Sequence, residues 1–76
     1  MKPKLLNEWE KYLEDRFTEF EKESKREKFP ISEGKLLSGL LSLNDTYCIT
    51  GDQEAIRLYR RYVQKFCDNI TKRGRR

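Results

Sequence analysis

The sequence predicts an all-α protein, a small helical bundle of two longer amphipathic helices bridged by a short leucine-rich helix. Two segments, residues 3–28 and 50–73, carry apolar side chains at intervals of three and four residues, the spacing of one face of an α-helix. The leucine-rich segment 33–43 lies between them. The brief β-prone run 46–49 has no second strand to pair with, so we expect an extended connector there and no sheet.

The chain is short for a protein that must bury a core. Its 76 residues are 36% hydrophobic and 39% charged, a polar balance close to the lower size limit for independent folding. We therefore expect one helical domain over residues 1–73, followed by a basic C-terminal tail at 74–76. Because small chains often gain stability by self-association, we also expect a homodimer.

The first predicted helix is held by an aromatic and aliphatic stripe. Pro3 suits its first turn, and Pro30 stops helical geometry at the residue before it. Residues 21–28 contain no apolar side chain, so they are expected to be a solvated helix end, or else an independent surface. The stripe that should face the core consists of Leu6, Trp9, Leu13, Phe17 and Phe20.

The second and third helices have recognisable start signals. Ser32 is expected to cap the leucine-rich helix, and Thr50 with Gln53 matches a capping box for the last helix. Gly74 is expected to end the last helix. The face of this helix predicted to be buried consists of Ile56, Tyr59, Val63, Phe66 and Ile70.

The net charge of +4 is distributed unevenly along the chain. Residues 1–29 carry eight basic and eight acidic side chains, and residues 30–56 carry one basic and four acidic ones. Residues 57–76 carry eight basic side chains against Asp68 alone. A concentrated positive charge of this kind attracts polyanions and acidic protein surfaces.

The basic residues of the last helix recur at helical spacing. Arg57, Arg61 and Lys65 are four residues apart, which predicts an exposed ridge able to follow nucleic-acid phosphates. Tyr62 stands at the border of this ridge, where it could stack on an unpaired base or equally cap the core. The full set predicted to bind nucleic acid or another anionic partner is Arg57, Arg60, Arg61, Tyr62, Lys65, Lys72, Arg73, Arg75 and Arg76.

Two functions are consistent with this pattern. A third interpretation gives the basic residues no binding partner and only a role in solubility. The first is a small non-enzymatic protein that binds single-stranded or duplex nucleic acid, mostly through its phosphate backbone or shape. A helix-turn-helix reader fits poorly, because Asp52 and Glu54 occupy the start of the helix that would meet base edges. The alternative is a small protein-binding regulator or inhibitor, of the kind encoded by viruses or mobile elements, that docks on a host protein or protein complex.

Several other classes are not expected. The chain has no histidine, and Cys48 and Cys67 lack the spacing of a zinc site, so we predict no enzyme, no cofactor and no metal. No apolar run is long enough to span a membrane, and no signal-peptide pattern is present. We expect a cytoplasmic protein, or a nuclear one if the source is eukaryotic.

Overall fold

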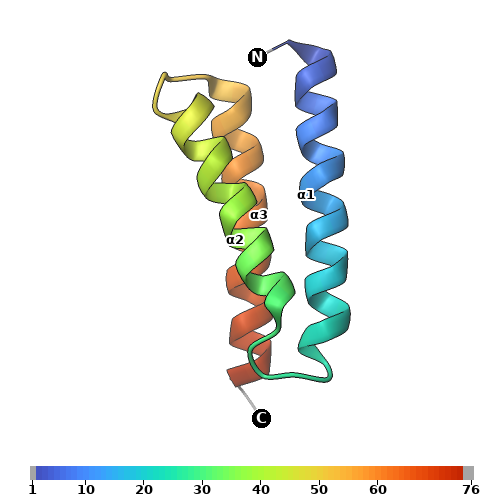
Figure 1. Cartoon of the computed structure of the whole chain (residues 1–76). Helices are drawn as coiled ribbons and strands as arrows, with labels where there is room; N and C mark the ends of the chain where they lie inside the picture. Colours follow the sequence, from blue (N-terminus) through green and yellow to red (C-terminus); the bar gives the residue numbers. More distant parts are fainter. Residues whose placement is uncertain (1, 75–76) are drawn as a thin grey trace.

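The chain forms three long helices in a computed structural model, and these are α1 (Pro3–Ser24), α2 (Ile31–Leu43) and α3 (Gln53–Gly74) (Figure 1). A single π-helical turn, η1 (Asn44–Cys48), continues α2. The structure describes residues 2–74, and of Arg73 and Gly74 it describes the backbone only. Over these residues the all-α prediction is confirmed, since no strand is present.

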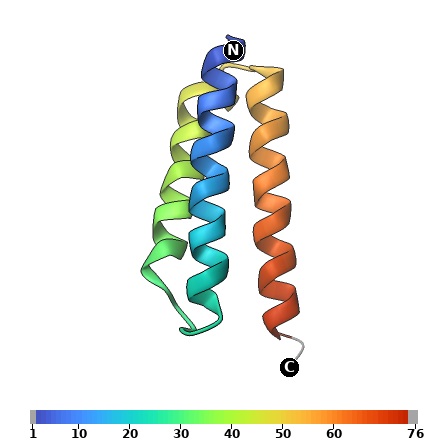
Figure 2. The same ribbon diagram turned by 90° about the vertical axis from the view of Figure 1, so that its right-hand side faces the viewer.

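The three helices lie side by side with alternating directions. In Figure 1, α1 runs downward, α2 returns upward and α3 runs downward again. The view from the side of α1 shows α2 and α3 flanking it (Figure 2). The molecule is an elongated rod with Cα extents of 40 × 19 × 16 Å, so its thickness is little more than that of two packed helices. Every part of each helix is therefore close to the surface.

The stripe predicted for α1 faces the core, as expected. Leu13, Phe17 and Phe20 are buried, and Leu6 and Trp9 are partly buried against the same cluster. The helix begins with Pro3 at its first turn but ends at Ser24, several residues before Pro30. This early end has a simple cause, because residues 21–28 offer no apolar side chain with which further turns could pack.

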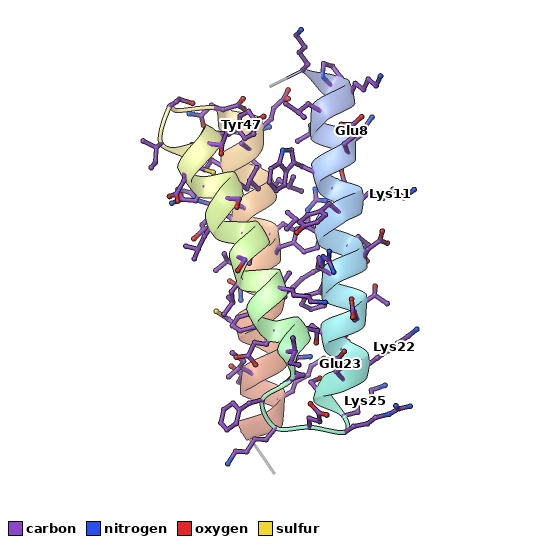
Figure 3. All side chains as sticks on the ribbon, in the orientation of Figure 1. Glu8, Lys11, Lys22, Glu23, Lys25 and Tyr47 are labelled. Carbon is purple, nitrogen blue, oxygen red and sulfur yellow. The ribbon has the colours of Figure 1, made fainter. Side chains whose placement is uncertain are left out.

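The start of α2 differs from the prediction, because Ser32 does not cap it. Pro30 holds the cap position, and Ser32 lies one position inside the helix with its side chain buried. The amide of Ser32 donates a hydrogen bond of 3.4 Å to the carboxylate of Glu23, which extends from α1 toward the beginning of α2 (Figure 3). A carboxylate at this position complements the positive end of the helix dipole.

A glycine allows α1 and α2 to approach closely. A Cβ atom at Gly39 would lie 2.8 Å from the ring of Tyr12 and 3.5 Å from Leu13, both on α1. Since real Cβ contacts are longer than 3.0 Å, a larger residue at this position would require the Tyr12 ring to move or the two helices to separate. Gly39 therefore marks the flank of α2 that faces α1.

The connection to α3 is helical where an extended segment was expected. Residues 44–48 form η1, and Tyr47 of this turn packs edge-on against Trp9, with ring centroids 6.2 Å apart. Gly51 has a φ of +86°, a left-handed conformation that glycine adopts without steric cost. The chain then reverses direction into α3.

The residue that caps α3 is also different from the predicted one. The carboxylate of Asp52 accepts the amides of Glu54 and Ala55 at 3.1 and 3.2 Å, so Asp52 is the cap. The hydroxyl of Thr50 instead donates to the carbonyl of Tyr47. At the other end α3 ends at Gly74, the residue predicted to end it.

The buried face of α3 is rotated from the predicted one. The core uses Ala55, Leu58 and Tyr62, which are each at most 3% exposed. Within the predicted stripe, Ile56 lies outside the core and Ile70 is 42% exposed. The other three residues of that stripe are Tyr59, Val63 and Phe66, and they are only partly buried at the edge of the core. Among the described residues, the buried cluster is Leu13, Phe17, Phe20, Leu36, Leu40, Leu43, Ala55, Leu58 and Tyr62.

A matched pair of phenylalanines tests this core. Phe20→Ala should lower the free energy of unfolding by about 3–5 kcal/mol, because it empties a fully buried position. Phe29→Ala, at a position that is 79% exposed, should change the free energy of unfolding by no more than about 0.5 kcal/mol. Urea unfolding followed by circular dichroism measures both, and equal losses in the two variants would contradict the described core.

Candidate anion-binding surface on α3

The outer side of α3 presents basic side chains along most of its length. We call Arg57, Arg60, Arg61, Lys65 and Lys72 the basic ridge. At a helical rise of 1.5 Å per residue, the ridge extends over about 22 Å between its first and last members. Arg57, Arg60 and Lys72 are exposed, and within residues 2–74 none of the three forms an ion pair.

The other two members of the ridge lean toward α1. Arg61 Nη1 lies 3.2 Å from Glu10 Oε1, and Lys65 Nζ lies 3.5 Å from Glu14 Oε2. All four side chains are between 42% and 55% exposed, so water and salt screen both pairs. Pairs of this kind contribute about 0–1 kcal/mol each, and a phosphate could replace the carboxylate at little cost.

The side of the ridge next to α1 is acidic. A shallow hollow on α1 is lined by Asn7, Glu10, Lys11, Glu14 and Asp15, and its two glutamates are the partners of Arg61 and Lys65. Lys11 points away from the other two helices (Figure 3). An incoming polyanion is therefore repelled on the α1 side and attracted on the outer side of α3. This geometry favours Arg57, Arg60 and Lys72 as the first contacts.

Tyr62, which was predicted as a base-stacking residue, lies in the core. Its side chain is 1% exposed, and its hydroxyl donates a hydrogen bond of 2.5 Å to Glu14 Oε2. Its ring meets that of Phe17 at 6.3 Å between centroids. The second reading of this residue, that it caps the core, is the one the structure supports. We therefore remove Tyr62 from the set of candidate binding residues.

The hydrogen bond between Tyr62 and Glu14 shifts the pKa of both groups. Burial, followed by the hydrogen bond to Glu14, raises the pKa of Tyr62 well above its ordinary value. The hydrogen bond from Tyr62 and then the charge of Lys65 lower the pKa of Glu14, although partial burial opposes them. Both shifts keep the phenol protonated and the carboxylate charged at neutral pH. The hydrogen bond between Tyr62 and Glu14 therefore links α3 to α1 at neutral pH.

The last three predicted binding residues are not placed by the structure. Arg75 and Arg76 lie outside the described residues, and so does the side chain of Arg73. The predicted tail at 74–76 overlaps α3 at Gly74.

No second chemical site competes with the ridge in the part of the chain that is described. No three side chains of the types that bind metals come together there. Cys48 is half-buried, and burial, then the charge of Asp52, raises the pKa of its thiol. Cys67 is exposed and forms no disulfide. None of the described helices has the length and apolar character needed to cross a membrane.

Comparison of the chain with protein-family models, with curated proteins and with solved structures gave no match. Its function is therefore inferred from its own residues.

The tie between Tyr62 and Glu14 makes a testable contribution to stability. Tyr62→Phe should lower the free energy of unfolding by about 1 kcal/mol at pH 7, because one net hydrogen bond is lost. Glu14 has a lowered pKa, so its stabilisation is present above its ordinary pKa of 4.5 and is lost as the pH falls through the folded-state value. Tyr62 has a raised pKa, so its stabilisation is present below pH 10 and is lost at higher pH.

Urea unfolding of the two proteins across this pH range measures the difference. The difference should be largest between pH 4.5 and 10, the ordinary pKa values of the two groups, and should shrink on either side. Tyr59→Phe is the matched control, since Tyr59 is only partly buried and has no hydrogen bond from its hydroxyl within residues 2–74. A difference that does not change with pH would exclude the ionised pair as its cause.

Proposed function

We propose that this protein is a small non-enzymatic nucleic-acid binder that contacts the phosphate backbone through the basic ridge of α3, extended by Arg73, Arg75 and Arg76. The observation that carries the proposal is a row of exposed cations that have no carboxylate partner within residues 2–74, namely Arg57, Arg60 and Lys72. A compartment that holds nucleic acid, the cytoplasm or a nucleus, is part of the proposal.

The dimensions of the ridge fit a phosphate backbone. Phosphates of one DNA strand follow one another about 3.4 Å apart along the duplex axis, so a ridge of about 22 Å faces several of them. Arginine is suited to this contact because its planar guanidinium offers two parallel hydrogen bonds to one phosphate. Displacement of the counterions around the phosphates then favours binding at low salt.

Little sequence readout is expected. The first turn of α3 begins at the acidic cap Asp52 and continues with Glu54, which would repel a groove lined by phosphates. The burial of Tyr62 removes the aromatic side chain that could have stacked on an unpaired base. Both features favour contact with the backbone over contact with bases, and duplex or shape recognition over stacking on single strands.

A protein partner is the second candidate. The pairs of Arg61 with Glu10 and of Lys65 with Glu14 are carboxylate contacts of the kind that an acidic protein surface would make with the ridge. In that case the protein would be a regulator that docks on an acidic helix or loop, and one or two anchor residues would dominate its affinity.

Single alanine substitutions at Arg57, Arg60 and Lys72 distinguish the two candidates. If phosphates are bound, each should weaken binding to all nucleic-acid sequences alike and should reduce the slope of log affinity against log salt by about one unit. Fluorescence anisotropy with labelled single-stranded and duplex RNA and DNA, titrated at several salt concentrations, measures both quantities. The absence of binding to all four probes at low salt would refute the nucleic-acid proposal.

Arg16→Ala is the matched control for these substitutions. This variant also removes one positive charge. Arg16, however, belongs to α1, where its guanidinium lies over the ring of Tyr12. Tyr12 in turn faces Gly39 of α2. The affinity of this variant should fall by less than that of any ridge variant. An equal loss would indicate attraction by net charge alone, without a defined surface.

A substitution on α1 should act in the opposite direction. Glu10→Gln removes a negative charge beside the ridge and releases Arg61 from its 3.2 Å pair, so affinity for nucleic acid should increase. The same anisotropy titration measures the gain, which should be largest at low salt because the interaction is exposed. Glu8→Gln, which removes an exposed carboxylate elsewhere on α1, should give a smaller gain. Unchanged affinity in Glu10→Gln would mean that Arg61 takes no part in binding.

A further inference from the structure

Two exposed apolar side chains stand at one end of the bundle. Phe29 and Ile31 flank Pro30 where α1 connects to α2, and each of the two is 79% exposed. Pro30 itself is buried, and its backbone is extended, with a φ of −71° and a ψ of 152°. Because successive side chains of an extended segment point to opposite sides, the burial of Pro30 directs both of its neighbours toward water.

This connection is hydrogen-bonded on both sides. After α1, the amides of Arg26 and Glu27 each donate to the carbonyl of Glu23 at 2.9 Å. Before α2, the amide of Glu33 donates to the carbonyl of Pro30 at 3.1 Å. These bonds fix the segment from which the two apolar side chains project.

Positive charge surrounds the apolar pair. Residues 25–31 contain three basic side chains, against Glu27 alone. Lys25 and Arg26 are exposed and form no ion pair within residues 2–74. Lys28 Nζ lies 5.7 Å from the centre of the Phe29 ring. We call the surface made by this segment the basic apolar tip, and its members are Lys25, Arg26, Lys28, Phe29 and Ile31.

The same end of the bundle carries further cations. Two views show the α1–α2 connection and the last turn of α3 at the same end (Figure 1 and Figure 2). This turn includes the exposed Lys72, and three more arginines lie in the sequence from 73 to 76. On α1, the exposed Lys22 lies one turn before the tip (Figure 3). The apolar pair is therefore bordered by cations from two helices.

The opposite end of the bundle provides a comparison. The connection between α2 and α3 also exposes an apolar side chain, since Ile49 is 71% exposed. Residues 44–54 around it contain three acidic side chains and no basic one. The two connections thus expose apolar side chains to a similar degree but surround them with opposite charge.

We propose that the basic apolar tip binds the surface of an anionic lipid membrane. Such a surface offers negatively charged head groups to the cations and, a few ångströms deeper, an apolar layer to Phe29 and Ile31. The tip lies at the end of an elongated rod, so it enters a soft surface without needing a matching cleft. Only the tip enters the membrane, and the three helices remain outside it.

The apolar side chains of the tip favour a membrane over nucleic acid. Nucleic acid would offer phosphates to the cations and a base on which Phe29 could stack. Ile31 is as exposed as Phe29, but it has no ring to stack and no polar atom for a base edge. A lipid interface accommodates both side chains, because it removes aliphatic and aromatic surface from water alike.

Co-sedimentation with vesicles at low salt tests the proposal. The wild-type protein should sediment with vesicles of mixed phosphatidylserine and phosphatidylcholine, and far less with vesicles of phosphatidylcholine alone. Lys25→Ala and Arg26→Ala should each lower the partition coefficient about fivefold, because each removes one charge near the anionic surface. Phe29→Ala and Ile31→Ala should each lower it at least about threefold, because less apolar surface leaves the water.

Two substitutions away from the tip are the matched controls. Ile49→Ala shortens an exposed aliphatic side chain at the opposite end, and Arg57→Ala removes an exposed cation near the start of α3. Each should change the partition coefficient by less than about twofold, since both positions are farther from the membrane than the screening length of the salt. Losses equal to those of the tip variants would indicate attraction without a defined surface and would overturn the proposal.

Tryptophan fluorescence tests whether the tip enters the apolar layer. Phe29→Trp should shift its emission to shorter wavelength when the mixed vesicles are added, because the indole leaves water. Ile49→Trp is the control and should show no such shift, while Trp9 is common to both variants. Emission of Phe29→Trp that does not change on sedimentation with the vesicles would exclude insertion of the tip.

The nucleic-acid titration separates the tip from the basic ridge. Phe29→Ala should leave the affinity for all four nucleic-acid probes unchanged, whereas Arg57→Ala should weaken it. A loss of nucleic-acid affinity in Phe29→Ala would assign the tip to the nucleic-acid surface and overturn the membrane proposal. A wild-type protein that stays in solution with both kinds of vesicle would overturn it as well, whatever the result with nucleic acid.

Discussion

The burial of Tyr62 against α1 determines how α3 is rotated, and most other features of the surface depend on that rotation. The phenol enters the core beside Phe17 and still reaches the carboxylate of Glu14, so a large polar residue is buried with its hydrogen bond satisfied. With Tyr62 inward, Arg61 and Lys65 are carried to the side of α1 and meet its glutamates. The same rotation moves Ile56 and Ile70 out of the core.

The rotation separates the core side of α3 from its exposed side. Ala55, Leu58 and Tyr62 enter the core, whereas Arg57, Arg60 and Lys72 are exposed. Because these charges stand in water, any attraction that they exert on an anion weakens as salt is added.

The thin shape of the bundle explains why so much of its apolar surface is left uncovered. Three helices enclose about one row of side chains from each, and the buried cluster of the described residues contains nine side chains. Apolar side chains beyond that number lie at the edge or outside, as Leu41 and Ile70 do. Small domains commonly compensate for such a limited core by association.

The sequence by itself determined the helical class, the positions of the three helices and the core face of α1. These features follow from local spacing and from proline and glycine positions, and α1 has one apolar stripe with no competitor. The basic ridge was also readable, since charge density needs no tertiary information. Only the tertiary structure decided which face of α3 is buried, and with it the role of Tyr62. Two rows of α3, one through Leu58 and Tyr62 and one through Val63, both satisfy helical periodicity. In the buried row the hydroxyl of Tyr62 donates a hydrogen bond to Glu14, which is 48 residues away in the sequence, and this bond favours the burial of Tyr62.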